Sequence, residues 1–324
     1  NALLFGTIPA ILAGFLLTAL PRWTGSEGPS MRTVRVLFVL WLCGRGIFIA
    51  LSPAAGLLAA ALFCASLFMI VARAVISNRD RRNIKLLLPL GAFTASVVLT
   101  AFSWHATLAL RMGLASIVGL LMIVGGRVVP ALTAAYGELS GRRGNIAYSA
   151  FVEWSAALVA TCALVAWIAS PDALITGLLC LLAAFWQSVR LAQWRGWHSR
   201  DSSVIALHAG YGWIVVGFIL VAIGIFLPGN PIRSDAIHAW TIGAIGTMAL
   251  AIMASMTRRH SGLALTRSTA MAAAYAMITG ACLARLAIGL SRQHAALGAF
   301  SATLWIAAFL LFLTAFRSPL FSPR

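Results

Sequence analysis

The sequence predicts an all-α protein, a polytopic transmembrane helical bundle with about eleven spans. Three observations support this fold class: 61% of the 324 residues are apolar, only 10% are charged, and the mean hydropathy is +0.95. A soluble domain of this length carries about 25% charged residues. Because lipid offers no hydrogen-bond partners to an open strand edge, we expect every span to be helical.

Apolar runs long enough to cross a bilayer follow one another along the whole chain. A bilayer core of about 30 Å needs about 20 helical residues at about 1.5 Å each. The runs are expected at 3–20, 34–51, 55–77, 84–104, 107–128, 146–169, 173–190, 203–227, 237–257, 268–290 and 295–316. No connection between them is long enough for a soluble domain, so we expect one transmembrane domain over 1–324. The first run begins almost at Asn1, which suggests an N-terminally truncated chain.

Helix-breaking residues mark the connections. Ser52-Pro53 and Ser170-Pro171 stand between apolar runs. Gly125-Gly126 is expected to let a neighbouring backbone approach closely. Pro130 is expected to end the fifth span within about a turn of Arg127.

Basic residues are distributed very unequally between the two sides of the predicted bundle. Eighteen lie in or beside the loops that follow the odd-numbered spans: Arg22, Arg32, Arg35, Arg79, Arg81, Arg82, Lys85, Arg127, Arg142, Arg143, Arg190, Arg195, Arg200, Arg258, Arg259, Arg267, Arg317 and Arg324. Only Arg233 and Arg292 lie in loops on the other side. Positively charged loops stay in the cytoplasm, so we expect the C-terminus there, and Trp194 at the inner membrane boundary. The net charge of +17 then reflects membrane orientation and not nucleic-acid binding.

The five cysteines are scattered through the apolar runs, without a CxxC pair or a Cys–His cluster. This pattern predicts small buried residues rather than disulfides or zinc ligands. No P-loop, GxSxG elbow, HExxH or CxxCH motif is present in the sequence.

Several charged residues lie within apolar runs, where each costs about 2.5–3.5 kcal/mol unless it faces protein or water. Among them are Arg45, Arg111, Arg285 and Glu153. Arg111 is near an outer end and can extend to the membrane surface. Arg45 and Arg285 could bind a carboxylate, such as a haem propionate or an anionic substrate, or they could pair with backbone carbonyls. Glu153 could relay protons or form structural hydrogen bonds. The sequence leaves these alternatives open.

The histidines divide by side: His105, His238 and His294 outside, and His198, His208 and His260 inside. His238 and His260 are 22 residues apart, or about 33 Å along a helix, so they cannot share one metal ion. His105 with His238 could form an outer site, and His208 with His260 an inner one. Imidazole is a common ligand of haem, copper and non-haem iron. A hydrogen-bonded structural role is the alternative for each.

The stretch HAWTIGAIGTMALAIMASMTRRHSG, at 238–262, resembles the signature of the NnrS family of bacterial membrane proteins. Further stretches agree in order: AGFLLTALPRWTG at 13–25, RRNIKLLLPL at 81–90 followed by His105, GGRVVPALT at 125–133, and RLAQWRGW with LHAGYGW within 190–213. Two features depart from the family. Arg259 replaces the glycine before His260, and the family's histidines before the LFG motif (4–6) are absent.

The resemblance implies a protein of about twelve spans in the bacterial inner membrane, with haem and copper as cofactors. It implies a role in the response to nitric oxide and in protection from nitrosative stress during denitrification. Nitric oxide or a nitrosylated metal species would be the partner, together with the lipid bilayer and an unassigned redox partner. The alternative function is a polytopic permease or metal exporter without haem, and a third is a structural assembly subunit.

The resemblance also implies site residues. His208, His238, His260 and His105 match the family's histidines and would be metal ligands. Three arginines are cofactor-binding candidates from their positions in the sequence and not from the resemblance: Arg45 and Arg285 as described above, and Arg127, which could cap backbone carbonyls or meet a haem propionate. The sharpest expectation concerns His238.

We expect His238 to bind haem in the outer half of the bundle, with Thr241 orienting it one turn later. Gly243 and Gly246 are expected to leave room for a bulky group between helices. The alternative is that His238 only forms a hydrogen bond, for example with Asp235.

The charge asymmetry gives a direct prediction of topology. A reporter fused after Arg324 should be active only in the cytoplasm, because eighteen of twenty loop-associated basic residues would lie on that side. Periplasmic activity of this fusion would overturn the orientation and the side assigned to every histidine.

Overall fold

A computed structural model describes residues 3–139, 148–230, 235–265, 268–291 and 293–321. Within these ranges the chain is helical and contains no strand, which confirms the all-α fold class. Eleven of the described helices are long and apolar enough to cross a membrane, as the sequence predicts. The protein is therefore a multi-pass membrane protein.

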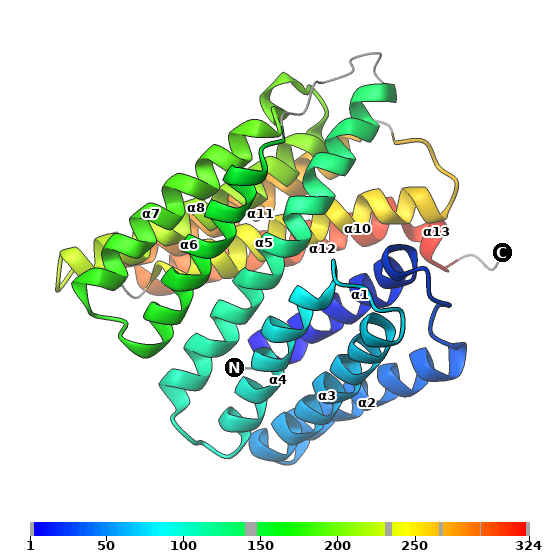
Figure 1. The fold of residues 1–324 in the computed structure, drawn as a ribbon, viewed down its shortest axis with the longest axis horizontal. Coiled ribbons are helices and arrows are strands. Elements are labelled where there is room, and N and C mark those ends of the chain that lie inside the picture. Colours follow the sequence, from blue (N-terminus) through cyan, green and yellow to red (C-terminus); the bar gives the residue numbers. More distant parts are fainter. Residues whose placement is uncertain (1–2, 140–147, 231–234, 266–267, 292, 322–324) are drawn as a thin grey trace. The chain divides into compact units, whose positions relative to one another are not determined.

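The chain forms two compact units, residues 1–120 and 121–324, and each is described by itself (Figure 1). The first contains η1 (Leu3–Thr7), α1 (Ile8–Thr24), α2 (Met31–Ala50), α3 (Pro53–Ser77), η2 (Ile84–Leu86), α4 (Leu87–Ala101) and the first part of α5 (Ala106–Leu139). The second contains the rest of α5, then α6 (Ala150–Ala169), α7 (Leu174–Gln193), η3 (Gly196–His198), α8 (Ser202–Phe226), η4 (Ala239–Gly246), α10 (Thr247–His260), α11 (Thr269–Leu286), η5 (Ala287–Leu290), α12 (His294–Ala315) and α13 (Arg317–Phe321).

Short polar side chains begin several helices. The Ser52 hydroxyl accepts a hydrogen bond from the Ala55 N–H at 3.5 Å, and Pro53 occupies the first position of α3, where no N–H is needed. The Asp201 carboxylate accepts a hydrogen bond from the Ser203 N–H at 2.8 Å and caps α8. These caps satisfy N–H groups of the first turn, so the helices begin where the sequence places its breakers.

The fifth span differs from the prediction. Helix α5 continues through Pro130 to Leu139, so the expectation that Pro130 ends it near Arg127 was wrong. A proline removes one backbone hydrogen bond from a helix. In a membrane bundle, neighbouring helices can satisfy the freed carbonyl, and such a proline is tolerated. Arg127 therefore lies inside α5 and does not fix its end.

In the first unit, α3 contacts α1, α2 and α4. Figure 1 shows α2 and α3 side by side in blue. Gly56 allows this approach, because a Cβ there would lie 2.5 Å from the Cα of Phe48 in α2. Only 11% of the α2 span is buried, as expected of a helix that faces lipid.

In the second unit, the span formed by η4 and α10 is the most enclosed. Of this span 72% is buried, against 17% for α12, and it contacts both α8 and α11. Its first part, η4, is a π-helix, a wider form that is frequent at functional sites. The longest motif of the sequence thus forms the centre of this unit.

Gly217 of α8 makes the closest approach to η4 possible. A Cβ at Gly217 would lie 2.1 Å from the Nε1 atom of Trp240, which is fully buried. The same nitrogen donates a hydrogen bond to the Ile214 carbonyl at 3.1 Å. The indole therefore cannot move aside without losing this bond.

Gly217→Ala should lower the free energy of unfolding by about 1–3 kcal/mol, because the added methyl group overpacks the helix contact. Gly212→Ala is the matched control in the same helix, since a Cβ there would meet only Leu191, at 3.8 Å. Thermal unfolding in detergent compares the two. Equal stability of the variants would contradict this packing.

Candidate functional site

A group of paired polar side chains surrounds Arg190, near the C-terminal end of α7. Arg190 is 7% exposed, and its Nε and Nη2 atoms donate to the carboxylate of Glu153 in α6 at 2.5–3.0 Å. Two parallel bonds between a guanidinium and a carboxylate form a strong, directional ion pair. Of the two roles left open for Glu153, this geometry supports the structural one.

Arg190 also connects two further helices. Its Nη1 atom donates to the Met122 carbonyl of α5 at 3.0 Å and to the Tyr211 hydroxyl of α8 at 2.7 Å. The Tyr211 hydroxyl donates to Gln187 Oε1 at 2.5 Å, and Gln187 Nε2 donates to the Ala156 carbonyl at 2.9 Å. Because buried polar groups are costly only when they lack partners, this network is compatible with the bundle interior.

Two glycines of α5 make room for this network. A Cβ at Gly126 would lie 1.9 Å from Arg190 Nη2, and one at Gly125 would lie 3.0 Å from the ring of Tyr211. The close approach expected at Gly125-Gly126 is therefore present. The approaching groups are side chains, however, and not the backbone of a neighbouring helix.

His208 lies in α8, one turn before Tyr211. Its Nδ1 atom lies 2.9 Å from the Val204 carbonyl, which favours the tautomer that carries a hydrogen on Nδ1. The Nε2 atom is buried and has no hydrogen-bond partner among the described residues. Metal-ligating histidines typically donate one ring N–H to a backbone carbonyl or carboxylate and leave the other nitrogen for the metal. His208 has this arrangement.

The connection after α7 packs against the His208 ring. The ring centroids of Trp194 and His208 are 6.3 Å apart, and Trp194 is almost fully buried. A Cβ at Gly196 would lie 2.3 Å from three atoms of the imidazole, so only glycine fits there. The stretches RLAQWRGW and LHAGYGW therefore meet at His208.

A second polar group surrounds His238, immediately before η4. The buried Asp235 carboxylate lies 3.4 Å from Arg285 Nη1, and Thr241 Oγ1 lies 3.4 Å from His238 Nδ1. Arg285 thus has a carboxylate partner within the protein, and the expected contact of Thr241 with His238 is present. Burial and the nearby Arg285 cation lower the pKa of His238 to about 4, which keeps the imidazole neutral, as a metal ligand must be.

The room beside Gly243 and Gly246 is already filled. A Cβ at Gly243 would lie 2.6 Å from Cγ of Trp213, and one at Gly246 would lie 3.1 Å from Ile278 and 3.6 Å from Trp305. These glycines do admit bulky groups, as expected, but the groups are side chains of α8, α11 and α12. The bulky groups between the helices are therefore the protein's own side chains.

The remaining predicted site histidines and Arg127 are not among the residues of these two groups. His105 is exposed in the turn before α5, with a φ of 46°, and His260 is the exposed last residue of α10. Arg127 is half-buried within α5. His105 belongs to the first unit and His238 to the second, so their pairing stays a prediction. In the described ranges, no three His, Cys, Asp or Glu side chains come together as a metal site would require.

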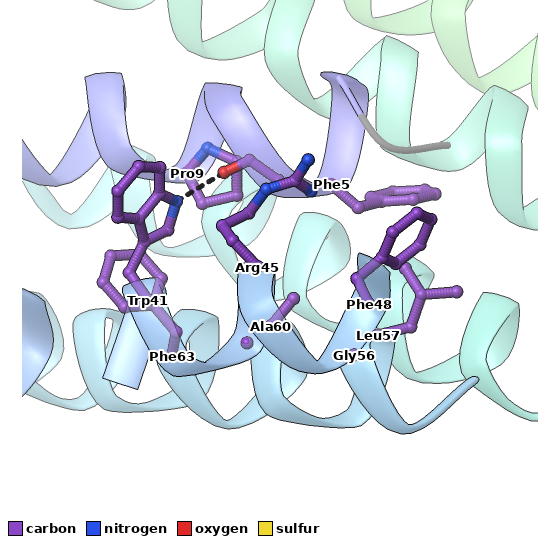
Figure 2. A pocket seen from close by; sticks show the side chains of 11 residues that line it. Phe5, Pro9, Trp41, Arg45, Phe48, Gly56, Leu57, Ala60 and Phe63 are labelled. Carbon is purple, nitrogen blue, oxygen red and sulfur yellow. Dashed lines mark hydrogen bonds between the residues drawn. The ribbon is translucent and has the colours of Figure 1, made fainter. Parts of the chain in front are cut away.

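Arg45 lines a hollow in the first unit, between η1, α2 and α3 (Figure 2). Trp41 and Phe48 flank it along α2, and Trp41 Nε1 donates to the Gly6 carbonyl at 2.7 Å. The guanidinium lies against Gly6, where a Cβ would be 2.0 Å from Nη1. The closed space is close to that of one water molecule. A haem would fit here only if these side chains moved.

A comparison with protein-family models matches the NnrS protein family over residues 1–324, the whole chain. The chain belongs to the NnrS family. It is therefore a membrane protein related to nitric oxide and nitrosative stress. Comparisons with curated proteins and with solved structures gave no match.

The structure gives physical reasons for parts of the NnrS resemblance and shows what the sequence analysis missed. Arg190 was counted only as a loop charge, and Trp194 as an interfacial residue, yet both are buried. Gln187 and Arg190 stand three residues apart on one helix face, near the end of an apolar run. Together with the lone intramembrane carboxylate of Glu153, this spacing was the signal that could have identified the network.

The ion pair of this NnrS chain predicts a large effect of removing one partner. Glu153→Gln should lower the free energy of unfolding by about 3–5 kcal/mol, because it leaves the Arg190 cation buried without its counter-charge. Glu138→Gln, at the exposed end of α5, is the control and should change little. Chemical denaturation in detergent micelles measures both variants. If Glu153→Gln is as stable as the control, the ion pair does not stabilise the fold.

Proposed function

We propose that this chain is a haem-binding protein of the bacterial inner membrane that handles nitric oxide, or a nitrosylated metal species, through a redox-active metal site. The role would be protection from nitrosative stress during denitrification. Family membership supports the link to nitric oxide. Loops rich in arginine support a cytoplasmic C-terminus.

One observation carries the metal-binding part of the proposal: the buried Nε2 atom of His208 has no partner among the described residues. A buried nitrogen without a hydrogen bond is unfavourable unless a ligand occupies it. The Val204 carbonyl holds the other nitrogen at 2.9 Å and so directs the lone pair of Nε2 away from the helix backbone. This donor would suit haem iron as a ligand.

The residues around His208 would hold and shield the cofactor. Gly196 covers one face of the imidazole, and the Trp194 indole excludes water from its edge. Haem iron, when bound, supplies a position that can coordinate nitric oxide or exchange an electron.

His238 is the second proposed haem ligand, in the other polar group of the same unit. Thr241 contacts its Nδ1 atom, and the Asp235–Arg285 pair lies beside it. Because the space at Gly243 is occupied by Trp213, a haem at His238 would have to lie on another side of the imidazole.

Copper is the less supported cofactor. A copper site needs several imidazole or thiolate donors close together. The described residues do not bring three candidate ligands together, so we assign no residue set to copper. His105 and His260 stay candidates on the family resemblance, and Arg45 and Arg127 on their positions in the sequence.

Two buried or half-buried arginines of the second unit, each paired with a carboxylate, favour the metal-site proposal over a permease. Arg190 is paired with Glu153, and Arg285 with Asp235. A transporter of anions would use such cations for its substrate, whereas here the protein's own carboxylates neutralise them. The neutral imidazole of His208 remains available to a metal.

A reduced-minus-oxidised optical spectrum with metal analysis tests the proposal. Purified protein should contain haem, and His208→Ala should lose most of one haem absorption band while still folding in the membrane. His238→Ala should lose a band if it also binds haem.

His294→Ala is the matched control, because His294 is exposed at the start of α12. Its spectrum should equal that of the wild type. Absence of haem from the wild-type protein, or an unchanged spectrum in both His208→Ala and His238→Ala, would reject the proposed function and favour the permease.

A further inference from the structure

We propose that Arg190 is the positioning residue of the His208 site. Its guanidinium holds the Trp194 indole in place. Trp194 in turn holds the connection at Arg195 and Gly196, and Gly196 fixes the His208 imidazole. The inference rests on the proposed ligand role of His208 and extends it to a residue that does not touch the metal.

The first step is the immobility of the guanidinium itself. Glu153 binds Nε and Nη2 from α6, the Met122 carbonyl binds Nη1 from α5, and the Tyr211 hydroxyl binds the same atom from α8. All three nitrogens are thus hydrogen-bonded, to partners on three different helices. A planar guanidinium held on every edge presents its face in a fixed direction.

The centre of the guanidinium lies over two aromatic rings. The Cζ atom of Arg190 is 5.5 Å from the ring centroid of Trp194 and 5.9 Å from that of Tyr211. The two rings are 4.6 Å apart, in an edge-to-face arrangement. Cation–π attraction and this ring contact both favour one position of the indole. Arg190 therefore fixes Trp194 one helical turn further along the chain.

Trp194 in turn holds a strained connection. The next residue, Arg195, has a φ of 54°, in the left-handed region that residues with a side chain rarely adopt. Such a conformation persists when its surroundings determine it. The buried Trp194 precedes it, and Gly196, pressed against the His208 ring, follows it. The turn is thus held at both ends.

The result is one orientation of the His208 imidazole. The Val204 carbonyl holds Nδ1, Gly196 covers a ring face, and Trp194 stands at its edge. Loss of the Arg190 planar contact should free the indole, relax the turn at Arg195 and let the imidazole rotate. Metal affinity depends on such outer contacts by about 10–100-fold.

Arg190→Lys is the decisive variant. Lysine keeps a positive charge beside Glu153 but lacks the planar guanidinium with its several donors. The ion pair therefore survives, while the contact that fixes Trp194 is lost. Protein prepared without haem and labelled with ¹⁵N-histidine should show one His208 signal, protonated at Nδ1, that is absent from His208→Ala. In Arg190→Lys this signal should split or broaden, and the affinity for added haemin should fall by about tenfold or more.

Gly217→Ala is the control for lost stability, because it disturbs α8 at Trp240 and not at His208. It should leave the His208 signal single. If Arg190→Lys does not fold, Trp194→Leu tests the same link and should split the signal in the same way. A single wild-type signal with unchanged haemin affinity in the folded variant overturns the positioning role.

The two proposals fail separately. If His208→Ala keeps every haem absorption band of the wild type, the ligand role of His208 is wrong, whatever the nuclear magnetic resonance signal does. If haem is lost in His208→Ala but Arg190→Lys matches the wild type in both measurements, only the positioning role is wrong.

Discussion

The buried ion pair between Arg190 and Glu153 is the interaction on which the second unit depends. Neither charge is tolerated alone in a packed, lipid-surrounded interior, so each helix that carries one must lie beside the other. The remaining donors of the guanidinium then require Tyr211 of α8 and a carbonyl of α5 at the same place. At position 126 of α5, only glycine leaves space for the Arg190 guanidinium. One side chain thus relates four helices.

The same constraint separates polar from apolar faces. On α6, Phe151 and Trp154 flank Glu153 in sequence and are 69% and 77% exposed, as expected of groups that face lipid, while the carboxylate turns inward. Arg285 repeats the pattern with Asp235 beside η4. These two cations of the unit are therefore balanced by the protein's own carboxylates. The Nε2 atom of His208 has no partner among the described residues, and an imidazole nitrogen suits the proposed metal better than it suits an anion.

The His208 site joins this framework to the proposed chemistry. Its own contacts are modest: one carbonyl, one glycine and one indole. In our proposal, the orientation of the imidazole depends on residues that do not touch the metal, since the Arg190 guanidinium holds Trp194 in place. A metal site supported in this way keeps its donor in one direction before the cofactor arrives, which reduces the cost of binding.

The sequence by itself determined the eleven spans, because the thickness of the hydrocarbon core sets the length of an apolar run. It also identified Glu153, Arg285 and the histidines, since such residues are rare in lipid-facing helices, although it placed Arg190 among the loop charges. It could not choose their partners. Glu153 lies 37 residues from Arg190, and Asp235 lies 50 residues from Arg285. Helix packing alone brings these pairs together, just as it allows α5 to continue through Pro130 and fills the space beside Gly243 with an indole.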